Sequence, residues 1–354
     1  MKADRDRVRD REKHGPLMNR RFWQVLFISV PVSISVFLSA LCSVAEAQQQ
    51  ARISTVGRLS QGHSSDPFTH SGLQAFQRGL RELGWVDGKN IRIESRWGEG
   101  RPDRLPELAV ELVRLPVDVF VALGNQAIRA AKQTSTAIPI VMSVSTDPVA
   151  LGFVTSLARP GGNITGLSWL GPELSGKRLE LLKETVPQVA RVAVLSNSAS
   201  PAHNQLMKEI ERAARDLGLM VRNYEARRPE DFEGTFRAMR DGGSHALLVQ
   251  PEPLLIDPHR ERIAALAIKH RLPAIYAWGM FVDAGGLLSY GPDLLDLHRR
   301  SAGYVDKILK GVKPAELPVQ QPTKFELIIN LKAAKQIGLR IPPHVLAQAD
   351  KVIK

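Results

Sequence analysis

The chain repeats one order of strands and helices, and this repetition constrains its fold more than any other feature. Residues 52–60 are typical of a strand, and a helix over 71–84 and a strand from Ile91 follow. The same order recurs between the strand over 191–196 and the strand that begins at Met220. Two β/α units of equal layout predict two lobes. Small molecules commonly bind in the cleft between such lobes.

Each half then continues with a helix, a strand, a loop, a second helix and a strand that begins with proline. These later strands are predicted over 117–123 and 139–144 in the first half, and over 245–249 and 273–278 in the second. They are short, nearly continuous apolar runs, which is typical of strands covered on both faces. The sequence therefore predicts an α/β protein of two Rossmann-like lobes, whose parallel sheets are joined by a hinge of several strands.

Three segments rich in glycine or proline mark the expected crossings between the lobes. They lie over 161–169, 288–291 and 314–322. Taken singly, each segment could be a surface turn. Together with the repeat they predict a hinge that permits the lobes to close around a ligand.

The crossings divide the chain into three parts. Residues 1–47 are predicted to be an N-terminal extension and signal peptide. The first lobe comprises 48–166 plus about 290–318. The second lobe comprises 167–289 plus about 319–354.

The N-terminal part has the order of a secretory signal. A charged block over 1–16 precedes Met18, which we expect to be the working initiator. Basic residues, an apolar run over 22–41 and the small-residue segment 45–47 follow, as in a cleavable leader. The sequence therefore predicts export to the periplasm and cleavage before Gln48.

Three alternatives for the leader stay open. The apolar run could remain as an uncleaved anchor. Cys42 could be a lipid acceptor, although the bulky Leu41 precedes it. Arg20 and Arg21 could belong to a twin-arginine signal. Because Cys42 is the only cysteine, the mature chain would have no disulfide, no cysteine metal site and no cysteine nucleophile.

The net charge indicates a basic surface. The chain carries 48 Lys and Arg against 36 Asp and Glu, a net charge of +12. The leader holds eight of the cations and five of the anions, a surplus of three, so the mature chain keeps a net charge of +9. Its basic residues are dispersed and form no cluster interleaved with aromatic residues, so we predict no nucleic-acid partner.

The sequence contains no motif that signals catalysis. It has no Gly-rich nucleotide fingerprint, no phosphate-binding loop, no zinc-protease motif and no nucleophile elbow. Its nine histidines are scattered. We therefore predict a protein that is not an enzyme, with no catalytic residue, no metal and no cofactor.

Polar residues instead gather where the predicted strands end. The carboxyl ends of parallel strands and the starts of the following helices open on one side, where they can receive a ligand. Six loops lie there, over 60–66, 124–126, 143–148, 197–200, 250–252 and 276–278. The candidate ligand-binding residues are Gln61, Ser65, Asn125, Gln126, Ser145, Thr146, Asp147, Asn197, Gln250, Glu252, Trp278 and Tyr290.

Asp147 and three aromatic residues each allow two interpretations. Asp147 could cap a helix that begins at Pro148, or it could in addition bind a ligand ammonium group. Tyr276, Trp278 and Tyr290 could cluster near the hinge and stack on a ligand, or each could pack at a strand end.

Several longer motifs resemble a known family. They are the segments 145–149, 157–166, 314–319 and 325–334, within a similarity that runs from about 52 to 339. These segments look like those of ABC-transporter substrate-binding proteins, in the family that includes predicted tryptophan and tyrosine binders. The resemblance implies a type I periplasmic-binding-protein fold with three hinge crossings.

The resemblance also implies roles for individual residues. Thr146 and Asp147 fall on the family's T-D-P motif, Asn197 on an Asn in the first loop of the second lobe, and Tyr290 on its Y-G hinge motif. The loops 124–126 and 250–252 depart from the amino-acid binders of the family, so the identity of the ligand stays open.

The predicted function is that of the periplasmic solute-binding component of an ABC importer. It would capture a small polar molecule, an amino acid or a related carboxylate, and present it to an inner-membrane permease with a separate ATPase. A ligand-binding module for a sensor or chemoreceptor is the main alternative, and an exported enzyme is a further one. A sugar-responsive repressor has the same two-lobed fold, but no helix-turn-helix precedes the lobes here.

Overall fold

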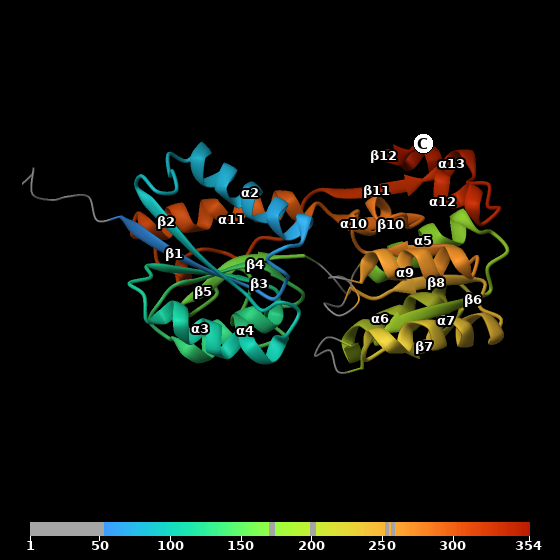
Figure 1. The fold of residues 1–354 in the computed structure, drawn as a ribbon, viewed down its shortest axis with the longest axis horizontal. Helices are drawn as coiled ribbons and strands as arrows, with labels where there is room; N and C mark the ends of the chain where they lie inside the picture. The colour runs from blue at the N-terminus through green and yellow to red at the C-terminus, as the bar shows by residue number, and fades with distance from the viewer. Residues whose placement is uncertain (1–52, 170–173, 199–202, 252–254, 256–258) are drawn as a thin grey trace, which may run out of the picture. The chain divides into compact units, whose positions relative to one another are not determined.

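The computed structural model describes residues 53–169, 174–198, 203–251, 255 and 259–354. Within them the chain forms two separate sheets, one of five strands and one of seven (Figure 1). The strands of the first sheet, all parallel, are β1 (Ser54–Ser60), β2 (Ile91–Trp97), β3 (Val119–Leu123), β4 (Ile140–Ser145) and β5 (Ile164–Ser168).

The second sheet repeats the strand order of the first. Its strands are β6 (Arg191–Ser196), β7 (Met220–Glu225), β8 (Ala246–Val249), β9 (Ala274–Tyr276), β10 (Leu288–Pro292), β11 (Phe325–Asn330) and β12 (Lys351–Ile353). The first sheet runs β2-β1-β3-β4-β5, and the second ends in the matching order β9-β8-β6-β7. The repeat predicted from the sequence is therefore confirmed in the order of the strands.

One pair of neighbouring strands differs from the parallel sheets that the sequence predicts. Strands β10 and β11 are antiparallel, with Pro292 opposite Phe325. The chain leaves the second sheet at the end of β10 and re-enters it beside the same residue. Because exit and entry lie at one end, β11 has to run in the opposite direction.

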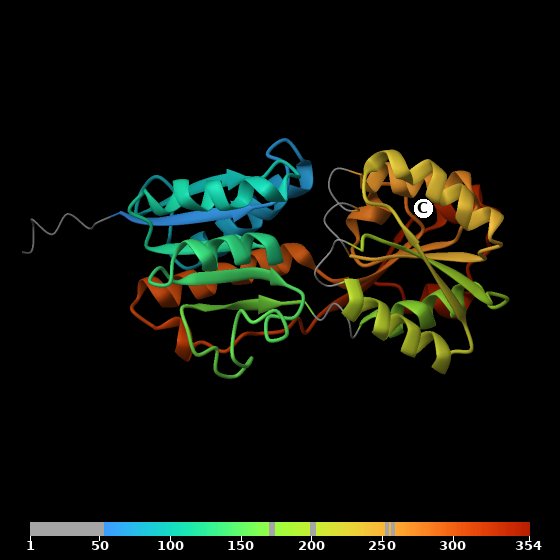
Figure 2. The ribbon, with the colours of Figure 1, turned by 90° about the horizontal axis from the view of Figure 1, so that it is seen from below.

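Helices cover both faces of each sheet. On the first sheet, α2 (Pro67–Glu82) and α11 (Leu294–Leu309) lie on one face, and α3 (Leu105–Val113) and α4 (Asn125–Thr134) on the other (Figure 1). On the second sheet, one face carries α5 (Leu174–Thr185), α6 (His203–Asp216), α12 (Leu331–Gln336) and α13 (Pro343–Gln348). The other face carries α7 (Phe232–Asp241), α9 (Arg260–Lys269) and α10 (Met280–Asp283) (Figure 2). Short 3₁₀ turns span Pro102–Arg104, Pro229–Asp231 and Pro314–Glu316.

The apolar spacing of the sequence explains which side of each helix is buried. In α6, Leu206, Ile210 and Ala214 recur every four residues and are each 1% exposed. This spacing places them on one face of the helix, where they pack against the sheet. None of the helices in the described residues is long and apolar enough to span a membrane.

The chain passes between the two sheets three times. It leaves the first sheet after β5, leaves the second after β10 to form α11, and returns to the second at β11. Leu167 and Gln320, from two of these passages, form a parallel bridge. The residue boundaries proposed for the lobes stay a prediction.

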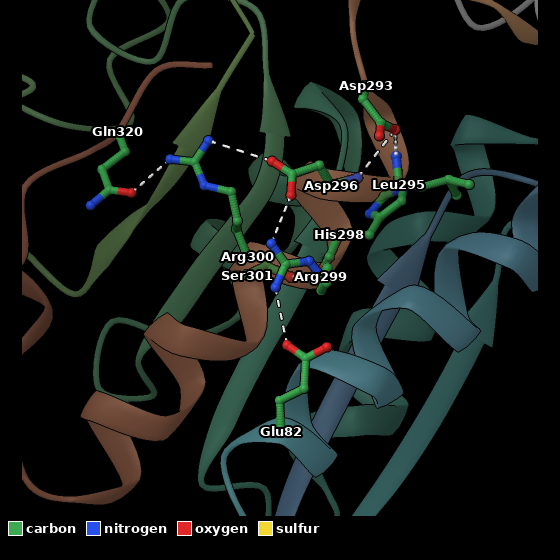
Figure 3. A network of polar contacts seen from close by, with 9 residues as sticks. All are labelled: Glu82, Asp293, Leu295, Asp296, His298, Arg299, Arg300, Ser301 and Gln320. Atoms are coloured by element: carbon green, nitrogen blue, oxygen red, sulfur yellow. Dashed lines mark hydrogen bonds and ion pairs between the residues drawn. The ribbon is translucent and has the colours of Figure 1, made fainter. Parts of the chain in front are cut away.

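Polar contacts hold α11 against the first sheet and α2 (Figure 3). Arg299 contacts Glu82 of α2 at 3.0 Å and Asp296 of its own helix at 2.9 Å. Arg300 donates a hydrogen bond to Gln320 at 2.8 Å. These bonds connect one sheet's helical layer to the segment that returns to the other sheet.

Candidate functional site

Asn125 ties together two of the loops that the sequence singles out. It is the first residue of α4, and its Nδ2 donates to Thr146 Oγ1 at 2.8 Å. Its Oδ1 accepts from Ser145 Oγ at 3.2 Å and from the Thr146 N–H at 3.1 Å. Gly124, at φ 85°, makes the tight turn from β3 into α4 that puts Asn125 there. The structure thus brings Asn125, Ser145 and Thr146 together.

The carboxylate of Asp147 has contacts at both oxygens. Its Oδ1 accepts from the N–H groups of Val149 and Ala150 at 3.2 and 3.0 Å. Its Oδ2 accepts from Gln205 Nε2, on α6 of the second sheet, at 2.9 Å. Asp147 therefore caps the turn that follows it rather than a helix, and it also joins the two halves of the chain.

The helix expected after Asp147 is absent from this described segment. Residues 148–152 form turns, with one α-helical hydrogen bond from the Leu151 N–H to the Asp147 carbonyl and a tighter bond from the Gly152 N–H to the Val149 carbonyl. The turn ends at Gly152, which has φ 67°, and the chain then buries Phe153 and Val154. Because these two side chains pack into the core, the backbone leaves helical geometry after one turn.

Trp169 connects this cluster to the second half of the chain. Its N–H donates to the Ser145 carbonyl at 3.0 Å, and its indole Nε1 lies 3.4 Å from Thr146 Oγ1. Its ring centroid is 5.2 Å from that of Trp278, at an angle of 50°. The sequence pattern indicated only that Trp169 lies in a hinge segment, and it gave no sign of a role beside the predicted site residues.

Arg178 was also missed, and it lies against the same tryptophan. It is 1% exposed, and its guanidinium stacks over the Trp169 ring at 5.7 Å. Its Nε donates to the Tyr290 carbonyl at 2.8 Å. Arg178 follows Leu174 by four residues and precedes Leu182 by four, so it lies in the apolar stripe of α5. A cation at such a buried position was the sequence signal that could have identified it.

Gln250 and Trp278 end neighbouring strands of the second sheet. Gln250 is 1% exposed, and neither its Oε1 nor its Nε2 has a hydrogen-bond partner within the described part of the chain. The same holds for Trp278 Nε1. Gln126, beside Asn125 on α4, has an unpartnered buried Oε1. Buried polar atoms almost always have partners, so these three side chains are chemically unsatisfied.

The three candidate aromatic residues do not form one cluster. Tyr276 is fully buried and stacks on Phe281 with ring centroids 4.5 Å apart, whereas Trp278 contacts Trp169. Tyr290 packs on the opposite side of the sheet, where its ring centroid lies 6.1 Å from that of Phe325. Ser289 of β10 is paired with Tyr276 of β9, and side chains alternate along a strand, so Tyr290 points to the face opposite Tyr276.

The remaining candidates among the described residues lie at the ends of β1 and β6. Gln61 is half-buried, and its carbonyl accepts from the Gly100 N–H at 3.0 Å, while Ser65 is exposed. Asn197 directly follows β6 and is half-buried. Glu252 lies outside the described residues. No group of His, Cys, Asp or Glu that could hold a metal occurs in the part of the chain that the structure describes.

A second buried arginine lies within the first sheet. Arg58, in β1, is 2% exposed, and burial lowers its pKa to about 10. Its Nη1 has no hydrogen-bond partner among the described residues. Burial together with the charge of Arg58 lowers the pKa of His298 to about 3, so this imidazole is neutral and contacts Ser143 Oγ at 2.8 Å.

Replacing Arg58 with methionine should stabilise the protein by about 1–4 kcal/mol. The substitution removes a buried charge that has no ion pair within the described ranges, and it keeps an apolar chain of similar length. Urea unfolding of the ligand-free protein measures the change. Arg92→Met, on the exposed side of β2, is the matched control and should leave stability unchanged. A loss of stability in R58M would mean that the guanidinium has a structural partner.

Comparison with known proteins agrees with this architecture. Residues 63–353 match the family described as "ABC transporter substrate binding protein". A curated relative, the "Tyrosine-binding protein" of Clostridioides difficile (strain R20291), is 24% identical over 275 residues, which cover 77% of this chain and 78% of the relative.

Two solved structures extend the comparison. The "ABC domain in complex with L-Trp" from Streptococcus pneumonia has a TM-score of 0.78 and 26% identity, covering 85% of this chain and 99% of that one. The leucine binding protein LivK of Thermotoga maritima, at 12% identity and a TM-score of 0.57, covers 73% of this chain and 83% of its own, and so shows the fold alone.

These comparisons confirm the predicted family and fold. The two-lobed α/β architecture is that of type I periplasmic binding proteins. The family is one of substrate-binding proteins rather than enzymes. The chain belongs to the family of ABC transporter substrate-binding proteins.

Proposed function

We propose that this chain is the solute-binding component of an ABC importer. It captures a small polar molecule, an amino acid or a related carboxylate, between its two lobes. The closed form then presents the ligand to an inner-membrane permease that works with a separate ATPase. Binding acts by population shift, since a ligand that contacts both lobes favours the closed form.

The observation that carries this proposal is the set of buried polar atoms without partners at the carboxyl ends of the strands. Gln126 lies on α4, which follows β3 of the first sheet, and Gln250 and Trp278 follow β8 and β9 of the second. Leaving such groups unpaired costs about 1–3 kcal/mol each. A polar ligand between the lobes would supply their missing hydrogen bonds. Removing the penalty of the unpaired groups would then contribute to the binding free energy.

Export is part of the proposal. Residues 1–47 act as a signal peptide that delivers the chain to the periplasm, where an importer collects its solute. These residues lie outside the described part of the structure. Mass spectrometry of the protein purified from the producing cell would give the mature N-terminus, which we expect at Gln48.

The relatives name the first ligands to try. One is called a tyrosine-binding protein, and another was solved with L-Trp. Calorimetric titration of the mature protein with L-tyrosine, L-tryptophan and other amino acids should give one ligand that binds at a ratio of one to one and raises the melting temperature. Chromatography should recover that ligand unchanged. Conversion of the ligand into a product would instead support an exported enzyme.

Replacing Asp147 with asparagine should weaken the affinity for an amino acid at least tenfold while the melting temperature stays nearly constant. Asparagine keeps the oxygen that caps the N–H groups of Val149 and Ala150, and the Gln205 amide can turn so that its oxygen accepts from the new Nδ2. The substitution removes the charge that would bind the ligand ammonium. Calorimetry and thermal melts of the same sample measure both quantities.

Asp147→Ala is the companion variant. It removes the cap as well as the charge, so it should lose both affinity and about 1 kcal/mol of stability. Unchanged affinity in D147N would show that Asp147 serves the turn and Gln205 alone, without a ligand contact.

A further inference from the structure

Arg178 is held rigidly by contacts that leave part of its guanidinium unused. Its Nε donates to the Tyr290 carbonyl at 2.8 Å, and its plane stacks over Trp169. Its Nη2 is buried and has no hydrogen-bond partner in the described ranges. A guanidinium fixed at one nitrogen and on one face is preorganised to bind an anion with what remains.

The charge of Arg178 is also unbalanced. The side chain is 1% exposed, and no carboxylate of the described residues forms an ion pair with it. Burial lowers the pKa of Arg178 to about 9, so the group still carries its charge at neutral pH. A buried cation is costly unless an anion pairs with it.

The position of Arg178 links it to the candidate site. Trp169, on which it stacks, contacts both Thr146 of the first sheet's edge and Trp278 of the second. A Cβ added to Gly291, in β10, would lie 3.6 Å from Arg178 Nη2. The unused nitrogen therefore faces the end of β10, and the guanidinium lies beside the Trp169 ring, which in turn contacts Trp278.

We propose that Arg178 is the counter-ion of a carboxylate on the ligand, with Trp169 and Trp278 as the apolar surface beside it. This inference rests on the proposed function and specifies the ligand class: an organic acid, rather than a neutral sugar or an amine. The stacked indole orients the guanidinium, and the bond to the Tyr290 carbonyl fixes which N–H groups point to the ligand.

The test compares acids with their own amides. The probes are L-tryptophan, L-tyrosine, L-leucine and benzoate, each beside its carboxamide, with tryptamine and D-glucose as ligands that lack a carboxylate. Calorimetry is run on the wild type, Arg178→Gln and Lys177→Gln. Lys177 is the matched control, since it is the neighbouring cation on α5, partly exposed and paired with Glu180 at 3.0 Å.

The expected result is binding of at least one acid but not of its amide. R178Q should lower the affinity for that acid by about thirtyfold or more, and K177Q should leave it unchanged. An amide, amine or sugar that binds the wild type as tightly as any acid would overturn the inference and leave the proposed function standing. So would R178Q with wild-type affinity for the acid.

A ligand-free measurement decides the case in which no probe binds. If no probe binds, the result counts against an amino acid or related carboxylate as the ligand. The role of Arg178 is then tested separately, by the melting temperature of the Arg178→Met variant. A group kept for a ligand should be dispensable for folding, so R178M should melt within about 4 °C of the wild type. A drop of more than about 10 °C would identify a structural arginine and overturn the inference.

Discussion

Replacing Gly79 with alanine should destabilise the protein by about 3 kcal/mol, whereas the same change at Gly303 should stabilise it by about 1 kcal/mol. A Cβ on Gly79 of α2 would lie 2.2 Å from the backbone carbonyl oxygen of Arg299 and 2.9 Å from Ala302 Cβ, both on α11. Because backbone cannot rotate aside, the two helices would have to separate. Urea unfolding of each variant measures the change.

Gly303 is the matched control because it also lies within α11. A Cβ there would meet nothing within 4 Å, so alanine adds no clash and only lowers the entropy of the unfolded chain. Equal and small effects at the two positions would contradict the close packing of α2 against α11. Gly72, seven residues before Gly79 on α2, faces His298 of α11 and extends this contact surface.

Most of the fold could be predicted because its signals are local and repeated. Apolar runs bounded by loops gave β3 and β8 within two residues of their observed starts, and the repeat gave two sheets with matching strand order. The antiparallel pair of β10 and β11 could not be predicted in this way. It depends on α11 packing against the first sheet, which is a contact between segments far apart in the sequence.

The candidate site could be predicted only in part, because position at a strand end says nothing about side-chain partners. Asn125 and Thr146 were found and do contact each other. The prediction of a helix after Asp147 was wrong, since Pro148 suits a turn as well as a helix. Trp169 and Arg178 were missed because a tryptophan in a hinge and an arginine in an apolar stripe both fit ordinary packing.

The second large effect should follow from replacing Asp66 with asparagine, which we expect to destabilise the protein by about 3 kcal/mol near neutral pH. Asp66 is 8% exposed, and its Oδ1 lies 2.5 Å from Arg260 Nη2, while its Oδ2 caps α2 through the Thr69 N–H at 2.9 Å. Asparagine keeps the cap and removes the charge. The ion pair joins α2, on the first sheet, to the start of α9, on the second.

Asp66→Ala separates the two roles of this side chain. It removes the cap as well, so it should cost about 1 kcal/mol more than D66N. The double variant D66N/R260M completes a mutant cycle, in which the coupling between the two side chains should reach about 2–3 kcal/mol. Additive losses would mean that the pair contributes nothing beyond the separate contacts of each residue.

The pH dependence gives an independent check of the same ion pair. Burial raises the pKa of Asp66, but hydrogen bonds from Arg260 and Thr69 and the charge of Arg260 outweigh this and hold the pKa below its ordinary value. A carboxyl with a lowered pKa contributes stability above its unfolded pKa, near 4, and loses it as the pH falls through the folded pKa. The stability difference between wild type and D66N should therefore be full at pH 7 and pH 5 and shrink below pH 4. A difference that stays constant down to pH 2 would contradict an ionised Asp66, because the ion pair with Arg260 is lost once the carboxylate is protonated.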